Sequence, residues 1–326
     1  MSGIFSSKVS IAGLSMAGGY AVAILTMAGF FGRWFDLFDL MAHFRCQYGT
    51  ILVVYLLAAL YFKHKKSAGV FFLALIINLF LIAPFYFSKN PSVKPGEQKI
   101  KLLLVNVNTR AGNPSKILKL IAEQQPDLII LQEISSRWLT DIAELQKNYP
   151  FSISRPREDN FGIALFSRLP LPDSQIIDIG QTGIPSIETR LSLDSSSIQV
   201  LAVHPTPPIG QDMTSRRNLM LAELGEIAAK RNSPLIIVGD LNTSPWGYHF
   251  KNLIEKGRLL DSACGHGISP TWPSNHLLLQ IPIDHFLHSS EIRVLSRQVC
   301  KDTGSDHFGL AVEFCLNQTF AQKKAR

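Results

Sequence analysis

The first quarter of the chain contains three long apolar stretches. Residues 9–32, 46–62 and 67–88 carry no charged side chain over 24, 17 and 22 positions. A helix needs about 20 apolar residues to cross the ~30 Å hydrocarbon core of a bilayer. The first and third stretches reach this length, and the second reaches it if residues 41–44 extend it and Arg45 is buried or snorkels to the interface. A signal peptide or a buried helix would explain one such stretch, but three in succession predict a membrane anchor over residues 1–88.

The pattern changes after a polar segment with two prolines, residues 89–98, which is typical of a linker. Short apolar runs then predict strands at residues 101–106, 128–131, 162–166, 189–193, 198–203, 235–238, 283–287, 292–295 and 310–314. Helical spacing of apolar positions occurs near residues 113–121, 138–145, 212–230 and 250–254. Strands outnumber helices and several are adjacent, which favours two packed mixed sheets flanked by helices over one doubly wound sheet. We therefore expect an α/β domain over residues 99–316, followed by a basic tail, residues 317–326.

Charge is divided unevenly between these parts. The 326 residues include 32 Lys or Arg and 25 Asp or Glu, a net charge of +7. Residues 1–94 hold eight basic and two acidic side chains, so the remaining residues carry only +1. Binding to a phosphate backbone recruits many basic side chains, so these numbers do not indicate a basic nucleic-acid-binding domain. The apolar content excludes a disordered chain, and four cysteines are too few for a disulfide scaffold.

The basic residues also predict an orientation in the membrane. With three crossings, the N-terminus and the second loop lie on one side, and this side carries the cluster Lys63-His64-Lys65-Lys66. Short loops rich in Lys and Arg face the cytoplasm. Lys89 and Lys94 oppose this assignment. The denser cluster predicts an integral membrane protein with an extracytoplasmic domain, whereas two crossings would reverse the side of the domain.

Polar side chains recur where the predicted strands begin or end. These residues are Asn106, Asn108, Glu133, His204, Asp240, Asn242, Asp284, Asp306 and His307. Taken one at a time, most have an ordinary structural explanation, since Asp and Asn often bond their own backbone in turns. Ligands of open α/β sheets gather at strand ends, so the whole set predicts one convergent site.

Carboxylates and amides in such a set favour phosphoester hydrolysis. The substrate is an anion that repels hydroxide, and a hard divalent cation held by oxygen ligands would offset this charge. Glu133 is the expected ligand for Mg²⁺, with Mn²⁺ as an alternative, and Asn106 and Asp306 are expected beside it. Asp240 can deprotonate or orient the attacking water, and Asn242 can fix that water or a phosphate oxygen.

The histidines fit the other half of this reaction. His307 and His204 can donate hydrogen bonds to the non-bridging phosphate oxygens, and Asp284 can hold His307 in the required tautomer. Arg190 lies on a strand otherwise expected to be buried. We expect Arg190 and Asn108 to contact the substrate, with a structural ion pair as the alternative for Arg190.

At these residues the sequence resembles the endonuclease/exonuclease/phosphatase (DNase I-like) family. The matching segments are residues 104–108, 131–133, 162–168, 203–205, 238–242, 282–287 and 304–307. Residues 243–246 and 270–273 are similar to membrane-anchored bacterial members. The resemblance implies a four-layer fold of two packed sheets between helices and Mg²⁺-dependent phosphoester cleavage. It also implies a metal role for Glu133.

The sequence departs from one branch of this family. Nucleases that recognise abasic DNA commonly have an acid two residues after the first Asn, where this chain has Asn108, and their catalytic tyrosine has no counterpart here. His204 is similar to the branch that includes DNase I and the neutral sphingomyelinases. We therefore expect a membrane-anchored phosphodiesterase or phosphatase whose substrate is a lipid headgroup or another phosphoester. A nuclease acting on nucleic acid is one alternative, and an inactive binding module on a membrane anchor is another.

Overall fold

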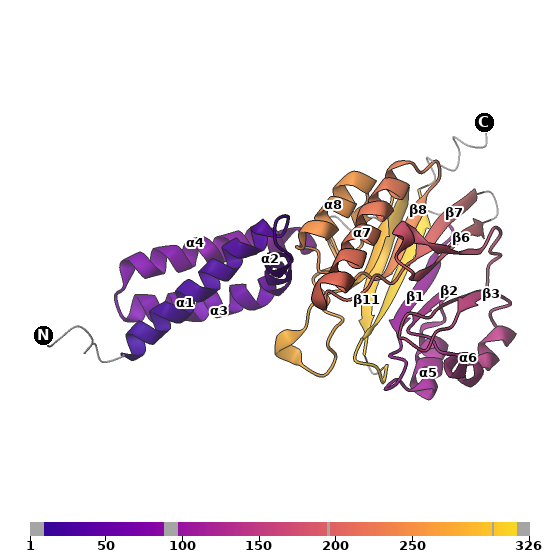
Figure 1. Cartoon of the computed structure of the whole chain (residues 1–326), viewed down its shortest axis with the longest axis horizontal. Coiled ribbons are helices and arrows are strands. Elements are labelled where there is room, and N and C mark those ends of the chain that lie inside the picture. Colours follow the sequence, from indigo (N-terminus) through magenta and orange to yellow (C-terminus); the bar gives the residue numbers. More distant parts are fainter. Residues whose placement is uncertain (1–9, 88–96, 194–195, 302, 318–326) are drawn as a thin grey trace, which may run out of the picture. The chain divides into compact units, whose positions relative to one another are not determined.

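The computed structural model describes residues 10–87, 97–193, 196–301 and 303–317. The chain divides into two compact units (Figure 1). One is formed by the N-terminal helices, and the other largely by the described residues from 85 to 317.

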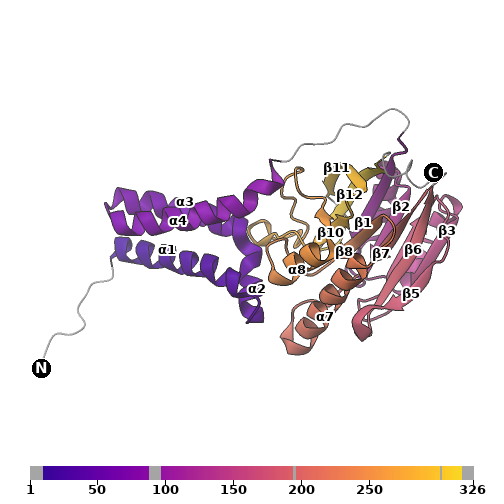
Figure 2. The ribbon, with the colours of Figure 1, turned by 90° about the horizontal axis from the view of Figure 1, so that it is seen from above.

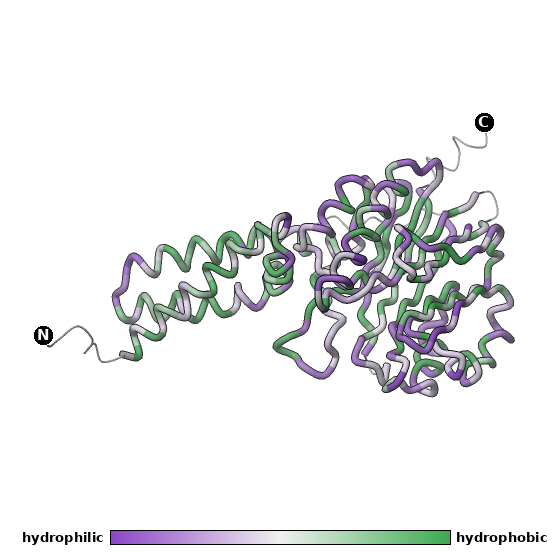
Figure 3. Tube along the Cα trace, viewed as in Figure 1, coloured by the Kyte–Doolittle hydropathy of each residue, from purple (hydrophilic) through white to green (hydrophobic). Residues whose placement is uncertain are grey.

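The N-terminal unit is entirely helical. Its elements are α1 (Ile11–Ala28), η1 (Gly29–Phe31), α2 (Asp36–Met41), η2 (Ala42–Phe44), α3 (Arg45–Tyr61), α4 (Lys65–Ile82) and η3 (Ala83–Phe85). They form three helical spans long and apolar enough to cross a membrane, at Ile11–Phe31, Asp36–Tyr61 and Lys65–Phe85. Apolar residues predominate along all three (Figure 3).

The second span is longer than its uncharged stretch because Arg45 is buried inside the unit. Its Nη1 donates a hydrogen bond of 2.6 Å to the carbonyl of Thr26, and its guanidinium lies 4.8 Å from the centre of the Phe30 ring. Glycines bring α1 close to the other helices. A Cβ on Gly19 would lie 2.3 Å from the Phe71 ring, so only glycine fits there.

The second unit contains two six-stranded mixed sheets. The order in the first is β11-β12-β1-β2-β4-β3, and in the second β5-β6-β7-β8-β10-β9. The strands are β1 (Ile100–Asn106), β2 (Leu128–Gln132), β3 (Phe151–Arg155), β4 (Ile163–Ser167), β5 (Gln175–Asp178), β6 (Pro185–Leu193), β7 (Ser196–Ala202), β8 (Leu235–Asp240), β9 (Leu260–Asp261), β10 (Asp284–His288), β11 (Ile292–Cys300) and β12 (Gly309–Leu316). The longer helices are α5 (Pro114–Gln124), α6 (Ser136–Asp141), α7 (Gly210–Ala229) and α8 (Tyr248–Gly257). Short 3-10 turns are η4 (Ala143–Lys147), η5 (Ile179–Gln181) and η6 (Leu277–Leu279).

Three hydrophobic cores hold these elements in four layers. Leu102 and Leu104 of β1 face the core between the two sheets, while Leu103 and Val105 face the core beneath α5 and α6. A third core lies between the second sheet and α7 and α8 (Figure 2). Strands buried on both faces have continuous apolar sequences, which explains why the sequence pattern located β1 so clearly. The expected fold of two mixed sheets flanked by helices is confirmed.

Candidate active site

The polar residues at the strand ends come from both sheets. Asn106 is the last residue of β1, and Glu133 directly follows β2, which runs parallel to β1. Asp240 ends β8, and Asp284, the first residue of β10, lies opposite Asp240 in their antiparallel register. His307 lies two residues before β12. The topology therefore gathers these side chains at one edge of the sandwich.

The centre of the site is a buried group of two carboxylates and one imidazole. His307 Nδ1 is 3.0 Å from Asp284 Oδ2, and His307 Nε2 is 3.7 Å from Asp240 Oδ2. The three ligand atoms lie within 4.8 Å of one another. His204 Nε2 approaches the same Asp240 oxygen at 3.7 Å. Four of the five residues expected to be catalytic thus meet around one carboxylate.

Asn106 connects this group to Glu133. Its Nδ2 is 3.0 Å from Glu133 Oε1, 3.4 Å from Asp240 Oδ2 and 3.5 Å from His307 Nε2. The side-chain amide oxygen of Asn106, Oδ1, accepts a hydrogen bond from the backbone N–H of Asn108. In this arrangement Asn106 presents its amide nitrogen, not its oxygen, to the carboxylates, which fits a positioning residue for Glu133 better than a metal ligand.

Asn108 and Asp306 form a second part of the site. Asn108 Nδ2 donates to Asp306 Oδ1 at 2.8 Å, and the indole of Trp272 donates to Asp306 Oδ2 at 3.0 Å. Trp272 lies within residues 270–273, for which the sequence indicated only a similarity to membrane-anchored members of the family. The pairing with Asp306 could not be read from the sequence, because 34 residues separate the two positions.

Asn242 lies in the turn after β8. Its backbone has a left-handed φ of 51°, and its N–H donates to Asp240 Oδ1 at 2.9 Å, so the structural explanation of this Asp-x-Asn pattern also holds. Arg217 of α7 is fully buried and donates from Nη1 to the Asn242 carbonyl at 3.1 Å. The sequence gave no signal for this support, since Arg217 belongs to an otherwise ordinary helix.

Gln132 joins the two sheets behind the site. Its Nε2 donates to the Val203 carbonyl at 2.6 Å, and its Oε1 accepts from the Asp240 N–H at 2.9 Å. Gly239 makes this approach feasible, because a Cβ there would lie 1.8 Å from the Val203 carbonyl oxygen. The sequence places Gln132 at a strand end but does not indicate that it fixes Asp240.

Burial and charge set the ionisation of the central group. Burial alone would lower the pKa of His307, but the charge of Asp284 and its hydrogen bond outweigh burial and raise the pKa to about 9. Burial would raise the pKa of Asp284, but the charge of His307 and their hydrogen bond lower it. Burial and the charge of His307 lower the pKa of His204 to about 4. At neutral pH, His307 is therefore cationic and His204 is neutral.

Asp240 and Glu133 have raised pKa values. Burial, followed by the charge of Asp284, raises the pKa of Asp240 to about 8, and burial raises the pKa of Glu133. Among the described residues, the four carboxylates of the site share the cation of His307, and the buried Arg297 acts on Asp284. A divalent cation would supply the missing positive charge, and carboxylate oxygens are the ligands that Mg²⁺ and Mn²⁺ prefer. The donor set thus fits such a metal.

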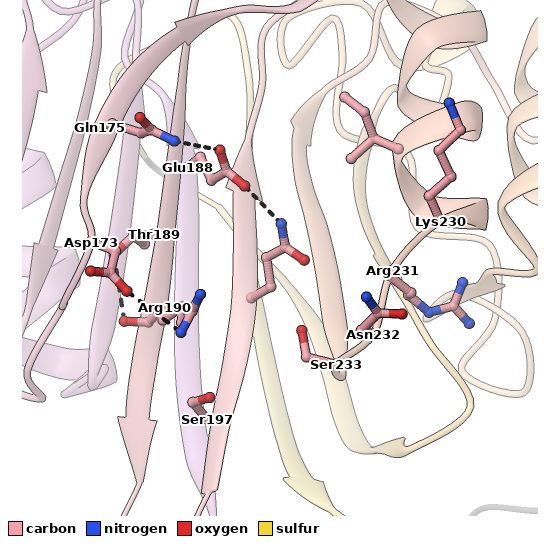
Figure 4. Close-up of a pocket in the computed structure, with 12 residues that line it drawn as sticks. Asp173, Gln175, Glu188, Thr189, Arg190, Ser197, Lys230, Arg231, Asn232 and Ser233 are labelled. Atoms are coloured by element: carbon pink, nitrogen blue, oxygen red, sulfur yellow. Dashed lines mark hydrogen bonds and ion pairs between the residues drawn. The ribbon is translucent and has the colours of Figure 1, made fainter.

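Arg190 does not join this cluster. It is exposed on β6 and pairs with Asp173 at 3.5 Å (Figure 4). In the register of the second sheet, Arg190 lies opposite Gln199, and Gln199 lies opposite Leu235, the first residue of β8. Asp240 is at the other end of that strand. Arg190 instead lines a cavity of about 480 Å³ with Gln175, Glu188, Lys230 and other polar residues.

The fold of this chain is similar to those of several solved structures. The chain is similar to the structure of an endonuclease/exonuclease/phosphatase from Beutenbergia cavernae DSM 12333, with a TM-score of 0.55 and 17% identity over 68% of this chain and 72% of that one. It is similar to a family protein from Bacteroides thetaiotaomicron, with a TM-score of 0.52 and 19% identity over 68% of this chain and 99% of that one. It is also similar to TDP2 of D. rerio complexed with single strand DNA product, with a TM-score of 0.55 and 16% identity over 67% of this chain and 99% of that one.

These identities show a shared fold. No curated protein sequence matches the chain. The sequence model of the Endonuclease/Exonuclease/phosphatase family matches residues 103–307. This range covers more than half of the chain and includes every residue of the site from Asn106 to His307. The chain therefore belongs to the endonuclease/exonuclease/phosphatase family, whose members include phosphoesterases and nucleases.

Proposed function

We propose that this protein is a membrane-anchored, divalent-metal-dependent hydrolase of phosphoester bonds. The observation that carries the proposal is the buried group of Asp240, Asp284 and His307, in which a cationic imidazole lies between two carboxylates. A purely structural ion pair needs one carboxylate. The second, Asp240, faces the same imidazole from the end of another strand and is suited to act on a water molecule.

The side chains divide the reaction between them. Asp240 would accept the proton of the attacking water in its ionised form. Burial and the charge of Asp284 raise its pKa to about 8, so this form is favoured by a bound cation or by a pH above 8. Asn242 directs its Nδ2 to the Pro205 carbonyl at 2.9 Å, which fixes its amide so that Oδ1 can accept a hydrogen bond from that water. His307 donates to a non-bridging oxygen of the phosphoryl group, and Asp284 keeps His307 protonated and oriented. His204, neutral at pH 7, contributes a further hydrogen bond.

Glu133 and Asp306 would hold Mg²⁺ or Mn²⁺, which would neutralise the charge of the phosphoryl group. Asn106 orients Glu133 through its 3.0 Å hydrogen bond, and Asn108 and Trp272 orient Asp306. Each proposed ligand is thus fixed by a neutral hydrogen-bond donor, as is common around metal sites.

The proposed substrate is a lipid headgroup or another phosphoester at a bacterial inner membrane, on its extracytoplasmic side. The three apolar spans and the near-neutral charge of the domain support this choice. The nucleic acid bound by the D. rerio protein keeps a nuclease as the alternative, although the domain has no excess of basic residues of the kind that phosphate backbones recruit.

The test uses the full-length protein in detergent micelles with Mg²⁺. Substrates are bis-p-nitrophenyl phosphate, p-nitrophenyl phosphate, plasmid DNA and a phospholipid. We expect Asp240→Asn and Glu133→Gln each to reduce turnover at least 100-fold, and chelation by EDTA to abolish it. Asp173→Asn, the same change at an exposed position beside Arg190, should leave turnover within two-fold of wild type.

The outcomes separate the candidate functions. Cleavage of plasmid DNA alone, lost in Glu133→Gln, would select the nuclease. If no substrate is turned over and Asp240→Asn equals wild type, the domain is a binding module and the proposal is wrong.

A further inference from the structure

The loop between β9 and β10 exposes an apolar tip beside the active site. Leu277, Leu278 and Leu279 form the turn η6 and are 80%, 82% and 54% exposed. No other stretch among the described residues of this unit exposes three consecutive large apolar side chains. Residues 262–283, which contain the tip, include no Asp, Glu, Lys or Arg over 22 positions. The projecting loop and its apolar end are visible in Figures 1 and 3.

Hydrogen bonds hold this tip in place. The base of the loop is closed by an antiparallel bridge between Trp272 and Ile281. The Trp272 N–H donates to the Ile281 carbonyl at 3.2 Å, and the Ile281 N–H donates to the Trp272 carbonyl at 2.6 Å. Within the loop, the Leu279 N–H donates to the His276 carbonyl at 2.9 Å. The turn is thus held by hydrogen bonds, and none of its three leucines is buried.

The same loop is attached to the catalytic residues. Ser274 donates from its N–H to the Asp306 carbonyl at 2.7 Å and from Oγ to the Ser305 carbonyl at 2.8 Å. Trp272 donates to the Asp306 carboxylate. Because Asp306 immediately precedes His307, the loop that carries the leucine tip is anchored directly to the segment of the active site.

A second exposed apolar residue follows another part of the site. The segment that begins at His204 ends at Ile209, the residue before α7, and Ile209 is 71% exposed. Asn242 bonds the Pro205 carbonyl of this segment. Two loops that adjoin proposed catalytic residues, Asp284 and His204, therefore each carry exposed aliphatic side chains.

We infer that the leucine tip, Leu277–Leu279, inserts into the surface of a lipid bilayer and holds the active site against it. The chain itself supplies the reason for choosing a bilayer, because its three apolar spans keep the domain at a membrane. An aliphatic turn within 22 uncharged residues enters the acyl boundary without burying a charge. Protein interfaces, in contrast, are enriched in aromatic residues such as Trp and Tyr and in Arg, and residues 273–283 contain no Trp, Tyr, Phe or Arg. Insertion of the leucine tip into a bilayer does not depend on the reaction that the domain catalyses, whereas a lipid substrate rests on the proposed function.

Insertion is measured first, without reference to activity. A fluorescent NBD probe is attached to Leu278→Cys in the full chain, with Cys264→Ser removing the exposed native thiol, and the protein is reconstituted in phosphatidylcholine–phosphatidylglycerol vesicles containing spin-labelled lipid. The matched control is Asn232→Cys, an exposed position beside the first residue of β8, at the opposite end of the strand from Asp240. We expect lipid quenching at position 278 to exceed that at position 232 at least five-fold.

Two results would overturn the inference. Equal, weak lipid quenching at both positions, with position 278 accessible to aqueous iodide, would place the tip in water. Protection from both quenchers would indicate cover by a protein or by a second copy of the chain.

Activity provides the second test. The triple variant Leu277→Ser, Leu278→Ser, Leu279→Ser should hydrolyse a bilayer phospholipid at least ten-fold more slowly, with bis-p-nitrophenyl phosphate turnover within two-fold of wild type. Ile176→Ser, at a half-exposed apolar position of β5, should change neither rate. Equal losses on both substrates, or no loss on lipid, would refute a role in interfacial hydrolysis. A wild type inactive on every phosphoester would refute the proposed function, while the quenching experiment would still decide insertion.

Discussion

The hydrogen bond between Asp284 and His307 helps to set the protonation state of the His307 imidazole. With Asp284 present, the pKa of His307 is about 9, although burial opposes the charged ring. The folded-state pKa thus lies above the ordinary value of 6.5. The raised pKa of His307 therefore stabilises the folded domain fully below pH 6.5 as long as Asp284 is ionised, and this contribution disappears as the pH rises through about 9.

Removal of the Asp284 charge should change the pH dependence of catalysis. In Asp284→Asn, burial is no longer outweighed, so the pKa of His307 falls and less of it is protonated at neutral pH. We expect the alkaline limb of the kcat/KM profile, near pH 9 in wild type, to move to lower pH by more than one unit. The profile is measured with bis-p-nitrophenyl phosphate at saturating Mg²⁺.

Asp173→Asn serves as the control because it removes an exposed carboxylate far from His307, and its profile should coincide with that of wild type. An unchanged alkaline limb in Asp284→Asn would show that His307 is not the group that titrates there.

At the level of the element, the end of β8 depends on one glycine. Gly239 has a φ of 155°, and a Cβ would meet the Val203 carbonyl oxygen at 1.8 Å and Gln132 Nε2 at 2.7 Å. Gly239→Ala must therefore separate the ends of β7 and β8 or displace Gln132. Overpacking of this kind lowers the free energy of unfolding by about 1–3 kcal/mol. We expect thermal unfolding of the purified full chain to shift down by several degrees, with loss of turnover because Asp240 is the next residue.

Gly225→Ala is the matched control for this change. Gly225 lies within α7, and a Cβ there would lie at ordinary contact distances of 3.4–3.7 Å from α8 side chains. Alanine also favours the helix by up to about 1 kcal/mol. If Gly239→Ala unfolded at the same temperature as Gly225→Ala, the close approach at β8 would carry no structural cost.

Elements with a strong hydrophobic pattern could be predicted from the sequence, whereas the edge strands β3, β5 and β9 could not. β1, β2 and β8 are buried on both faces and appear as continuous apolar runs. β3 and β5 are edge strands with mostly exposed side chains, so they carry no apolar run and were missed. The strand-end residues were found because polar groups stand out against these runs. Gln132 and Arg217 act through hydrogen bonds to distant backbone, which no local pattern encodes.

For the whole molecule, the distribution of charge predicts which side of the membrane carries the catalytic domain. The second loop, with Lys63, Lys65 and Lys66, should face the cytoplasm. A reporter enzyme that is active only outside the cytoplasm should therefore be active when fused after Lys94. The same reporter fused after Lys66 should be inactive in whole-cell assays. Activity in the reverse pattern would place the domain in the cytoplasm.

The pairing of β1 with β12 has a consequence for biosynthesis. β1 is the first strand of the domain to leave the ribosome, yet one of its two partners, β12, ends at Leu316, ten residues before the end of the chain. His307, two residues before β12, reaches Asp240 and Asp284 only after this strand is in place. A nascent chain that has not yet released β12, or a chain truncated before it, therefore lacks the imidazole of the buried group, so the site is completed only by the last strand of the domain.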